Sequence, residues 1–221
     1  MLRSFALLLV LGFGTACTRT LVRPYPAPVA ERSAREPAAR PVVLAGAPTK
    51  AGRNAVSEEE AVSYLMARGM EIPVAGRTVK NLEDTFDDGR DGGRTHRALD
   101  ILAPRGTPVL AADSGRILRI SENRLGGNTV YTTDPEERIV YYYAHLDAYQ
   151  PGLVQGMTIA RGDTLGFVGT TGNAPKDTPH LHFQVMRMPA DGKYWDGEPI
   201  NPYPLFILEY AAHDTLVKGA R

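Results

Sequence analysis

Pro179-His180-Leu181-His182-Phe183, continued by Gln184 and Val185, is the stretch of this chain that decides its fold and its chemistry. In a β-strand, alternate side chains leave the same face of the sheet. The polar face of this stretch then holds His180, His182 and Gln184, and the apolar face holds Leu181, Phe183 and Val185. The pattern predicts a strand with one face in a core and two imidazoles on the other.

A second pair of candidate ligands, His96 and Asp100, lies upstream with Ala98 between them. The alternation of residue types predicts that both side chains leave one face of a strand, which ends before a turn at Pro104 to Gly106. Zinc binds imidazole nitrogen and carboxylate oxygen, and catalytic zinc sites commonly combine three protein ligands with water. His96, Asp100 and one of the two close histidines would supply those three ligands.

His145 is the next informative of the five histidines. It lies in a predicted strand from Arg138 to Leu146, where alternation places it on the face of Tyr141 and Tyr143. We interpret these two tyrosines as half-buried strand residues rather than as a substrate-binding surface. Three histidines and an aspartate exceed the needs of a tetrahedral site that keeps a water position, so the surplus residues are candidates for proton transfer.

Together these residues resemble the LytM-type, lysostaphin-like zinc peptidases of family M23, whose pattern is His-x-x-x-Asp, then a lone His, then His-x-His. The corresponding segments here are His96-Arg-Ala-Leu-Asp100, Tyr-Ala-His145-Leu and His180-Leu-His182-Phe. The resemblance covers about Asn81 to Phe206, and it includes Gly126 to Val130 and Gly162 to Gly169. It is therefore far more specific than any single fragment.

The resemblance implies that His96, Asp100 and His182 bind one zinc ion (Zn2+), and that His145 and His180 are the catalytic histidines. Zinc brings the pKa of bound water from about 16 to about 7 and polarises a peptide carbonyl. The two catalytic histidines would share proton transfer and oxyanion stabilisation, and the sequence does not divide those jobs. The implied fold is a compact antiparallel β-sheet groove with the metal on its floor.

One position departs from the family pattern, which has glycine in the third place of the five-residue motif where this chain has Ala98. Alanine is the smallest residue with a Cβ atom, and a strand does not require a positive φ. We therefore expect the site to accommodate Ala98, with any effect falling on the rate more than on metal binding.

Taken singly, these features have simpler explanations, because isolated histidines and aspartates are commonly satisfied by water or structural hydrogen bonds. Chance outweighs a metal site for His96 with Asp100 alone, and the two explanations are even for His-x-His alone; jointly the metal site is favoured. Arg90 and Arg94 are interpreted as solvated loop charges, with contact to an anionic substrate as the alternative. His213 is interpreted as a terminal surface residue.

Residues 1–16 are predicted to be a signal peptide, because their apolar run from Phe5 to Phe13 follows a basic residue and is too short to span a membrane. Gly14-Thr15-Ala16-Cys17 resembles the bacterial lipobox, although glycine replaces the preferred aliphatic residue, so ordinary secretion is the alternative. Cys17 is the only cysteine, which favours lipid attachment. Thr18 predicts outer-membrane sorting by resemblance to bacterial lipoproteins, and hence a periplasmic location.

Residues 17–53 are predicted to be a disordered tether rich in Pro, Ala and Arg. Residues 1–53 carry eight Lys or Arg and two Asp or Glu, so their net charge of +6 leaves −6 for residues 54–221 of this neutral chain. A solvated linker explains this basic arm at least as well as contact with anionic lipid or cell-wall polymer. Export and the acidic body disfavour nucleic acid as a partner.

The remaining chain predicts a mainly β domain with a short N-terminal helix. Residues 54–80 form a helical lead-in, where Ser57 and Glu60 make a capping-box pattern before an apolar stripe and a stop near Gly69. The stripe consists of Val62, Leu65 and Met66. Strands are predicted at Val109 to Ala112, Arg116 to Ile120, Thr129 to Thr132 and Leu165 to Val168.

The M23-like domain is predicted over residues 81–210, with a C-terminal tail over 211–221. About 150 residues suffice for one core. Pro199 to Pro204 is expected to close the domain, before Leu205 to Tyr210 either packs on it or trails away.

The favoured function is a zinc-dependent endopeptidase that hydrolyses peptide stems or cross-bridges of peptidoglycan. The alternative is a non-catalytic cell-wall-binding or amidase-activating lipoprotein, against which the intact motif positions weigh. A lipoyl-type carrier domain is rejected, because the turn at Gly162 to Gly166 lacks the hairpin lysine. The bond cleaved, the need for a cell-wall or division protein as partner, and a lid or plug role for residues 81–95 stay open.

Overall fold

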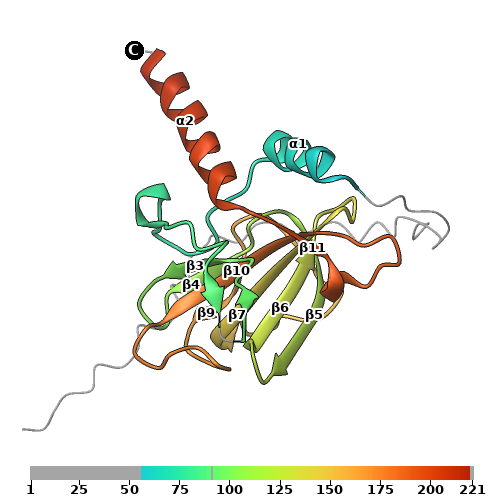
Figure 1. Ribbon diagram of the computed structural model, residues 1–221, viewed down its shortest axis with the longest axis vertical. Coiled ribbons are helices and arrows are strands. Elements are labelled where there is room, and N and C mark those ends of the chain that lie inside the picture. Colours follow the sequence, from blue (N-terminus) through green and yellow to red (C-terminus); the bar gives the residue numbers. More distant parts are fainter. Residues whose placement is uncertain (1–55, 91, 220–221) are drawn as a thin grey trace, which may run out of the picture. The chain divides into compact units, whose positions relative to one another are not determined.

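The structure is a computed structural model that describes residues 56–90 and 92–219, with side-chain surroundings as far as residue 212 (Figure 1). The predicted signal peptide, Cys17 and the predicted tether over residues 17–53 lie outside the described residues. Among the described residues, no helix combines the length and the apolar character needed to cross a membrane.

Helix α1 (Glu58–Arg68) begins and ends where the sequence predicts. The Ser57 side chain accepts a hydrogen bond from the Glu60 amide at 3.2 Å, and the Glu60 carboxylate accepts from the Ser57 amide at 2.9 Å, which completes the capping box. Gly69 ends the helix with φ +68°. Leu65 is buried as expected, but Met66 is 41% exposed, because Ala61 and Leu65, one turn apart, form the inward face.

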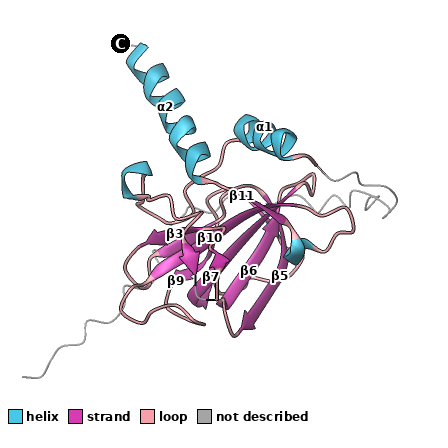
Figure 2. Ribbon diagram, in the orientation of Figure 1, coloured by secondary structure: helices cyan, strands magenta, loops and turns pink. Residues whose placement is uncertain are grey.

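The strands form a nine-stranded antiparallel sheet and a separate two-stranded hairpin (Figure 2), which confirms the predicted mainly β class. The hairpin pairs β1 (Gly89–Arg90) with β2 (Arg94–Thr95). The large sheet contains β3 (Leu99–Leu102), β4 (Pro108–Leu110), β5 (Gly115–Asn123), β6 (Gly127–Thr133), β7 (Ile139–Tyr149), β8 (Thr158–Ile159), β9 (Thr164–Val168), β10 (His180–Arg187) and β11 (Glu198–Ile200). The remaining elements are η1 (Val79–Asn81), η2 (Tyr194–Asp196) and α2 (Tyr203–Gly219).

Strand β10 lies at the centre of the site because it pairs with three other strands. On one edge it pairs with β11 and with β3, where Asp100 lies opposite His182 and Leu102 lies opposite His180. On the other edge it pairs with β7, where Ala144 lies opposite His182. Residues directly opposite one another share a face of the sheet. Strands β3 and β7 therefore bring their side chains to the two sides of the histidine pair.

The other face of β10 enters the core, as its alternation predicts. Leu181, Phe183 and Val185 are all 0% exposed. The Phe183 ring packs on Tyr141 and Tyr143 of β7, with ring centroids 6.4 and 5.3 Å away. Truncation of a fully buried aromatic side chain costs about 3–5 kcal/mol, so this face fixes the register that holds the histidines.

The prediction of a single strand from His96 to Asp100 is wrong. Strand β2 ends at Thr95 and β3 begins at Leu99, because Arg97 between them adopts φ +57°. A residue in that left-handed region turns the chain out of an extended path. Ala98 has no positive φ and is fully buried, as expected for an alanine that the fold accommodates.

The face predicted for His145 is also wrong, although the strand that carries it is confirmed. His145 adopts φ +62°, and the pairing of β6 with β7 shifts its register between Asn128 and Val130. A bulge of this kind adds one residue and reverses the alternation beyond it. Tyr141 and Tyr143 lie in the core and are fully buried, which corrects the prediction that they are half-buried. His145 instead joins the face that carries Tyr142, whose ring centroid is 6.1 Å from that of His182.

Helix α2 packs on the domain through its first turn, where Leu205 is 5% and Phe206 is 2% exposed. Glu209 accepts a hydrogen bond from the Met70 amide at 3.0 Å, which connects α2 to the segment after α1. The segment from Leu205 to Tyr210 thus packs rather than trails away, and the helix continues to Gly219 across the boundary predicted at residue 210. His213 lies beyond the residues whose side chains are described.

Asp113 links α1 to the sheet through hydrogen bonds with Arg68 of α1 and Tyr141 of β7. Its carboxylate is fully buried, and it accepts from Arg68 at 2.6 and 2.8 Å, from Arg161 at 3.1 Å and from the Tyr141 hydroxyl at 3.2 Å. Burial acts to raise the pKa of Asp113, but the hydrogen bonds from the two guanidinium groups outweigh it and lower that pKa.

We expect Asp113→Ala to lower the free energy of unfolding by about 3 kcal/mol, because it removes the acceptor of the buried Tyr141 hydroxyl and of two partly buried guanidinium groups. The contribution of Asp113 is present above the unfolded-state pKa of about 3.9 and is lost as the pH falls, because the folded-state pKa is the lower one. Urea unfolding at pH 7 and at decreasing pH measures both effects. Replacement of exposed Asp191 by alanine is the control, and equal stability losses for the two variants would contradict the assignment.

Candidate metal centre and neighbouring histidines

Three side chains, from strands β3 and β10 and from the segment between β2 and β3, converge on one point. His96 Nε2 lies 2.9 Å from His182 Nδ1 and 3.0 Å from Asp100 Oδ1. His182 Nδ1 lies 3.1 Å from the same carboxylate oxygen. These are the residues that the sequence resemblance assigned to a metal, and the structure brings all three together.

The spacing of the three atoms fits a zinc ion. A tetrahedral centre with bonds of roughly 2.0–2.1 Å separates its ligand atoms by about 3.3–3.4 Å, and the measured separations of 2.9–3.1 Å lie close to that value. Two imidazole nitrogens and one carboxylate oxygen are also a donor set that zinc accepts. The residues present therefore fit a zinc site with three protein ligands.

Backbone carbonyls orient three of the imidazoles. His96 Nδ1 lies 2.8 Å from the Thr85 carbonyl, His145 Nδ1 lies 2.9 Å from that of Thr171, and His180 Nδ1 lies 2.8 Å from that of Thr178. A carbonyl oxygen only accepts, so in each case Nδ1 carries the hydrogen and Nε2 keeps its lone pair. That tautomer lets His96 bind a metal and lets the other two accept a proton.

His145 and His180 flank the three candidate ligands without being part of them. Their ring centroids lie 5.0 Å apart, and that of His145 lies 5.6 Å from His182. His180 Nε2 lies 3.8 Å from Asp100 Oδ1. The structure thus gathers all five residues that the sequence assigned to the site.

The protonation states suit metal binding and proton transfer. Burial lowers the pKa of His145 to about 4, and the nearby imidazoles of His182 and His180 add to this shift. Burial also lowers the pKa of His182. For Asp100, burial acts to raise the pKa, but the close imidazoles of His182 and His96 outweigh it and hold the pKa well below its usual range. Near neutral pH, His145 and His182 are neutral and Asp100 is ionised, as metal ligation and general-base chemistry require.

Thr85 positions two of the candidate ligands and has no signal in the sequence. Its hydroxyl accepts from the Asp100 amide at 3.0 Å and donates to the Ala98 carbonyl at 3.3 Å. Its carbonyl orients His96, as described above. Thr85 lies fifteen residues before Asp100 in a loop, so only the folded chain reveals this role.

Arg90 is the second residue whose contact with a candidate ligand the sequence did not predict. Its guanidinium donates to Asp100 Oδ2 at 2.6 Å, while Oδ1 faces His96 and His182. The two oxygens of Asp100 therefore have separate partners, and Arg90 holds the carboxylate in the orientation that presents Oδ1. The interpretation of Arg90 as a solvated loop charge is corrected, because the β1–β2 hairpin directs its side chain to the site.

We expect Arg90→Ala to weaken zinc binding by roughly 10–100-fold, the usual cost of losing a residue that orients a metal ligand. Competition with a chromogenic chelator measures the affinity. Arg119, an exposed arginine on β5, supplies the control variant Arg119→Ala. Unchanged zinc affinity in the Arg90 variant would show that Asp100 keeps its orientation without this contact.

A three-ligand set with two free imidazoles on an antiparallel sheet fits the class of metal-dependent hydrolases. A comparison with models of known protein families narrows this class to one family. Residues 94–202 match the model of Peptidase family M23. Residues 94–202 therefore form a peptidase family M23 domain, and this segment lies within the range of the resemblance recognised in the sequence.

Several curated proteins share part of their sequence with this chain. The chain is 32% identical over 123 residues to the L-Ala--D-Glu endopeptidase of Bacillus subtilis, across 52% of this chain and 37% of that protein. It is 37% identical over 94 residues to the peptidoglycan DD-endopeptidase ShyC of Vibrio cholerae, across 42% of this chain and 20% of that protein. It is 30% identical over 95 residues to the uncharacterized lipoprotein YgeR of Escherichia coli, across 43% of this chain and 35% of that protein.

Each of these matches spans less than half of the relative's own length. Among solved structures, the catalytic domain of lysostaphin from Staphylococcus simulans aligns with a TM-score of 0.45 at 25% identity, across 66% of this chain and 96% of that one.

Proposed function

We propose that this chain is a zinc-dependent endopeptidase that hydrolyses peptide stems or cross-bridges of peptidoglycan. The observation that carries the proposal is the convergence of His96 Nε2, Asp100 Oδ1 and His182 Nδ1 within 3.1 Å of one another, inside an M23 domain. The names of two relatives, an L-Ala--D-Glu endopeptidase and a peptidoglycan DD-endopeptidase, support the choice of substrate.

In this proposal His96, Asp100 and His182 hold one zinc ion. Zinc, when bound, supplies a Lewis acid that polarises a peptide carbonyl and makes water acidic near neutral pH. Arg90 and Thr85 keep Asp100 and His96 in the orientation that this role needs. The preformed arrangement lowers the cost of organising the site for each turnover.

His145 and His180 carry the proton transfers. One imidazole accepts a proton at Nε2 from the attacking water as the water oxygen bonds to the peptide carbon. The C–N bond then breaks as an imidazole donates a proton to the leaving amine. Both rings have Nδ1 bound to a backbone carbonyl, so either can present Nε2 for these steps.

Export and anchoring remain part of the proposal. We infer that residues 1–16 are a removed signal peptide and that Cys17 is lipidated. Residues 17–53 then tether the domain of residues 81–210, which lies in the bacterial periplasm, to the outer membrane. The lipobox-like stretch before Cys17 and the similarity to a lipoprotein support this inference. The mass of the membrane-extracted protein tests it, and an unmodified protein that still contains Met1 to Ala16 would refute it.

The test of the activity is digestion of purified, cross-linked peptidoglycan by the wild-type protein and by His180→Ala, followed by identification of the fragments by mass. New amino termini without freed lactyl carboxyl groups indicate peptide cleavage, whereas freed lactyl groups indicate an amidase. A zinc-loaded wild-type protein that binds peptidoglycan without releasing fragments would favour the alternative of a cell-wall-binding or amidase-activating lipoprotein.

A further inference from the structure

A pocket of about 410 Å³ lies beside His180 and belongs to none of the roles assigned above. Leu102 of β3 lines it and lies directly opposite His180 in the strand pairing, on the face that carries Asp100. Leu102 is 50% exposed, whereas His180 is 7% exposed. The pocket therefore continues the site face of the sheet outward from the catalytic histidine.

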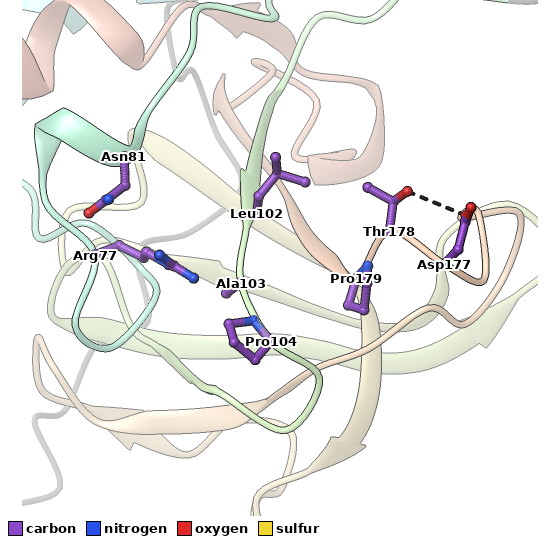
Figure 3. Close-up of a pocket in the computed structure, with 8 residues that line it drawn as sticks. All are labelled: Arg77, Asn81, Leu102, Ala103, Pro104, Asp177, Thr178 and Pro179. Carbon is purple, nitrogen blue, oxygen red and sulfur yellow. Dashed lines mark hydrogen bonds between the residues drawn. The ribbon is translucent and has the colours of Figure 1, made fainter.

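The pocket has one wall that donates hydrogen bonds. Figure 3 shows Arg77 extending towards Ala103 and Pro104, with Asn81 on the same side. The Asn81 amide oxygen accepts from the Thr78 amide at 2.9 Å and from its hydroxyl at 3.2 Å, which leaves the amide hydrogens for the pocket. The Arg77 guanidinium has no hydrogen bond or ion pair with any residue that the structure describes.

The opposite wall differs in charge. Asp177, Thr178 and Pro179 form it (Figure 3), and the Thr178 hydroxyl donates to Asp177 at 3.4 Å. Thr178 also orients His180 through its carbonyl, so the pocket and the catalytic imidazole share a chain segment. The pocket and the proposed chemistry are thus connected through Leu102, which lies opposite His180, and through Thr178.

We propose that this pocket is a substrate subsite that binds a carboxylate of the peptide, with Arg77 and Asn81 as its donors. The inference rests on the proposed function, because it takes the substrate to be a peptidoglycan peptide. A guanidinium matches the planar geometry of a carboxylate with two parallel hydrogen bonds, and an adjacent neutral amide adds a third. Leu102 provides apolar contact for the part of the peptide between the carboxylate and the scissile bond.

The carboxylate has two sources in such peptides, an acidic residue or the chain end, and three synthetic stem peptides distinguish them. One carries D-Glu and a free carboxyl terminus, the second has D-Glu replaced by D-Gln, and the third has an amidated terminus. Binding is measured by calorimetry in the zinc-loaded His145→Ala background, and kcat and KM are measured in the otherwise wild-type protein.

We expect Arg77→Met to weaken binding of the first peptide by about tenfold and to raise KM equally, with kcat changed less than twofold. Arg77→Lys is expected to recover part of the loss. The D-Gln peptide and the peptide with the amidated terminus each lack one carboxylate. Whichever of them lacks the recognised carboxylate should bind with equal affinity whether residue 77 is arginine or methionine. Asp177→Asn is the matched control on the opposite wall, and it should leave KM unchanged or lower it.

Two results would overturn the subsite: an equal effect of Arg77→Met on all three peptides, or no binding of any peptide by the His145→Ala protein that keeps Arg77. Either result leaves the proposed function intact if peptidoglycan is still cleaved. Conversely, Arg77-dependent binding by a zinc-loaded protein that cleaves nothing would refute the proposed function and retain the subsite.

Discussion

Replacement of His182 by alanine is expected to abolish stoichiometric zinc binding and to reduce peptidoglycan hydrolysis to background. Among the described residues, His182 Nδ1 is one of the three ligand atoms that converge, at 2.9 Å from His96 Nε2 and 3.1 Å from Asp100 Oδ1. Two remaining ligands fall short of the three that catalytic zinc sites commonly provide. Metal analysis after dialysis, beside a fragment-release assay, measures both expected losses.

The matched control for this variant is Gln184→Ala, because Gln184 lies two residues further along β10 on the same face. Its amide donates to the Arg97 carbonyl at 2.9 Å and contacts none of the three candidate ligands. The Gln184 variant should keep its zinc. Full zinc occupancy and full activity in the His182 variant would show that the zinc ion binds at another site.

Replacement of His145 by alanine is expected to leave zinc occupancy unchanged and to lower turnover by roughly 10²–10⁴-fold, the range for loss of a general acid or base. The reason is geometric: His145 Nδ1 is held by the Thr171 carbonyl at 2.9 Å, so its free nitrogen serves proton transfer beside the ligand set. Zinc content and single-turnover hydrolysis, measured on the same preparation, separate the two properties.

Tyr142→Phe provides the comparison for His145, since Tyr142 lies on the same face of β7 near His182. It should retain most of the turnover, because no catalytic step is assigned to its hydroxyl. If His145→Ala loses zinc together with activity, His145 is a metal ligand, and the division between ligands and proton-transfer residues must be redrawn.

The parts of the site that the sequence predicted correctly depend on local geometry. The alternation in β10 follows from the extended backbone itself, so Leu181 and Phe183 enter the core while His180 and His182 do not. The capping box of α1 is equally local, because Ser57 and Glu60 are three residues apart. Neither prediction required knowledge of a distant segment.

The errors arose where one residue departs from the regular backbone. Arg97 at φ +57° breaks the strand expected between His96 and Asp100, yet their ligand atoms still lie 3.0 Å apart. His145 at φ +62° reverses the alternation that placed it with Tyr141 and Tyr143. A positive φ at a residue with a side chain is uncommon and is maintained by surrounding contacts, so alternation along the sequence does not reveal it.

The sequence by itself determined the mainly β class, the five residues of the candidate site and the family resemblance, because strand alternation and motif spacing are properties of neighbouring residues. Only the tertiary structure decided which face carries His145, which oxygen of Asp100 faces the histidines, and that Arg90 and Thr85 hold that carboxylate and His96 in place. These features depend on strand register and on contacts between segments far apart in the chain, and such contacts are formed by the packing of the whole domain rather than by any local pattern.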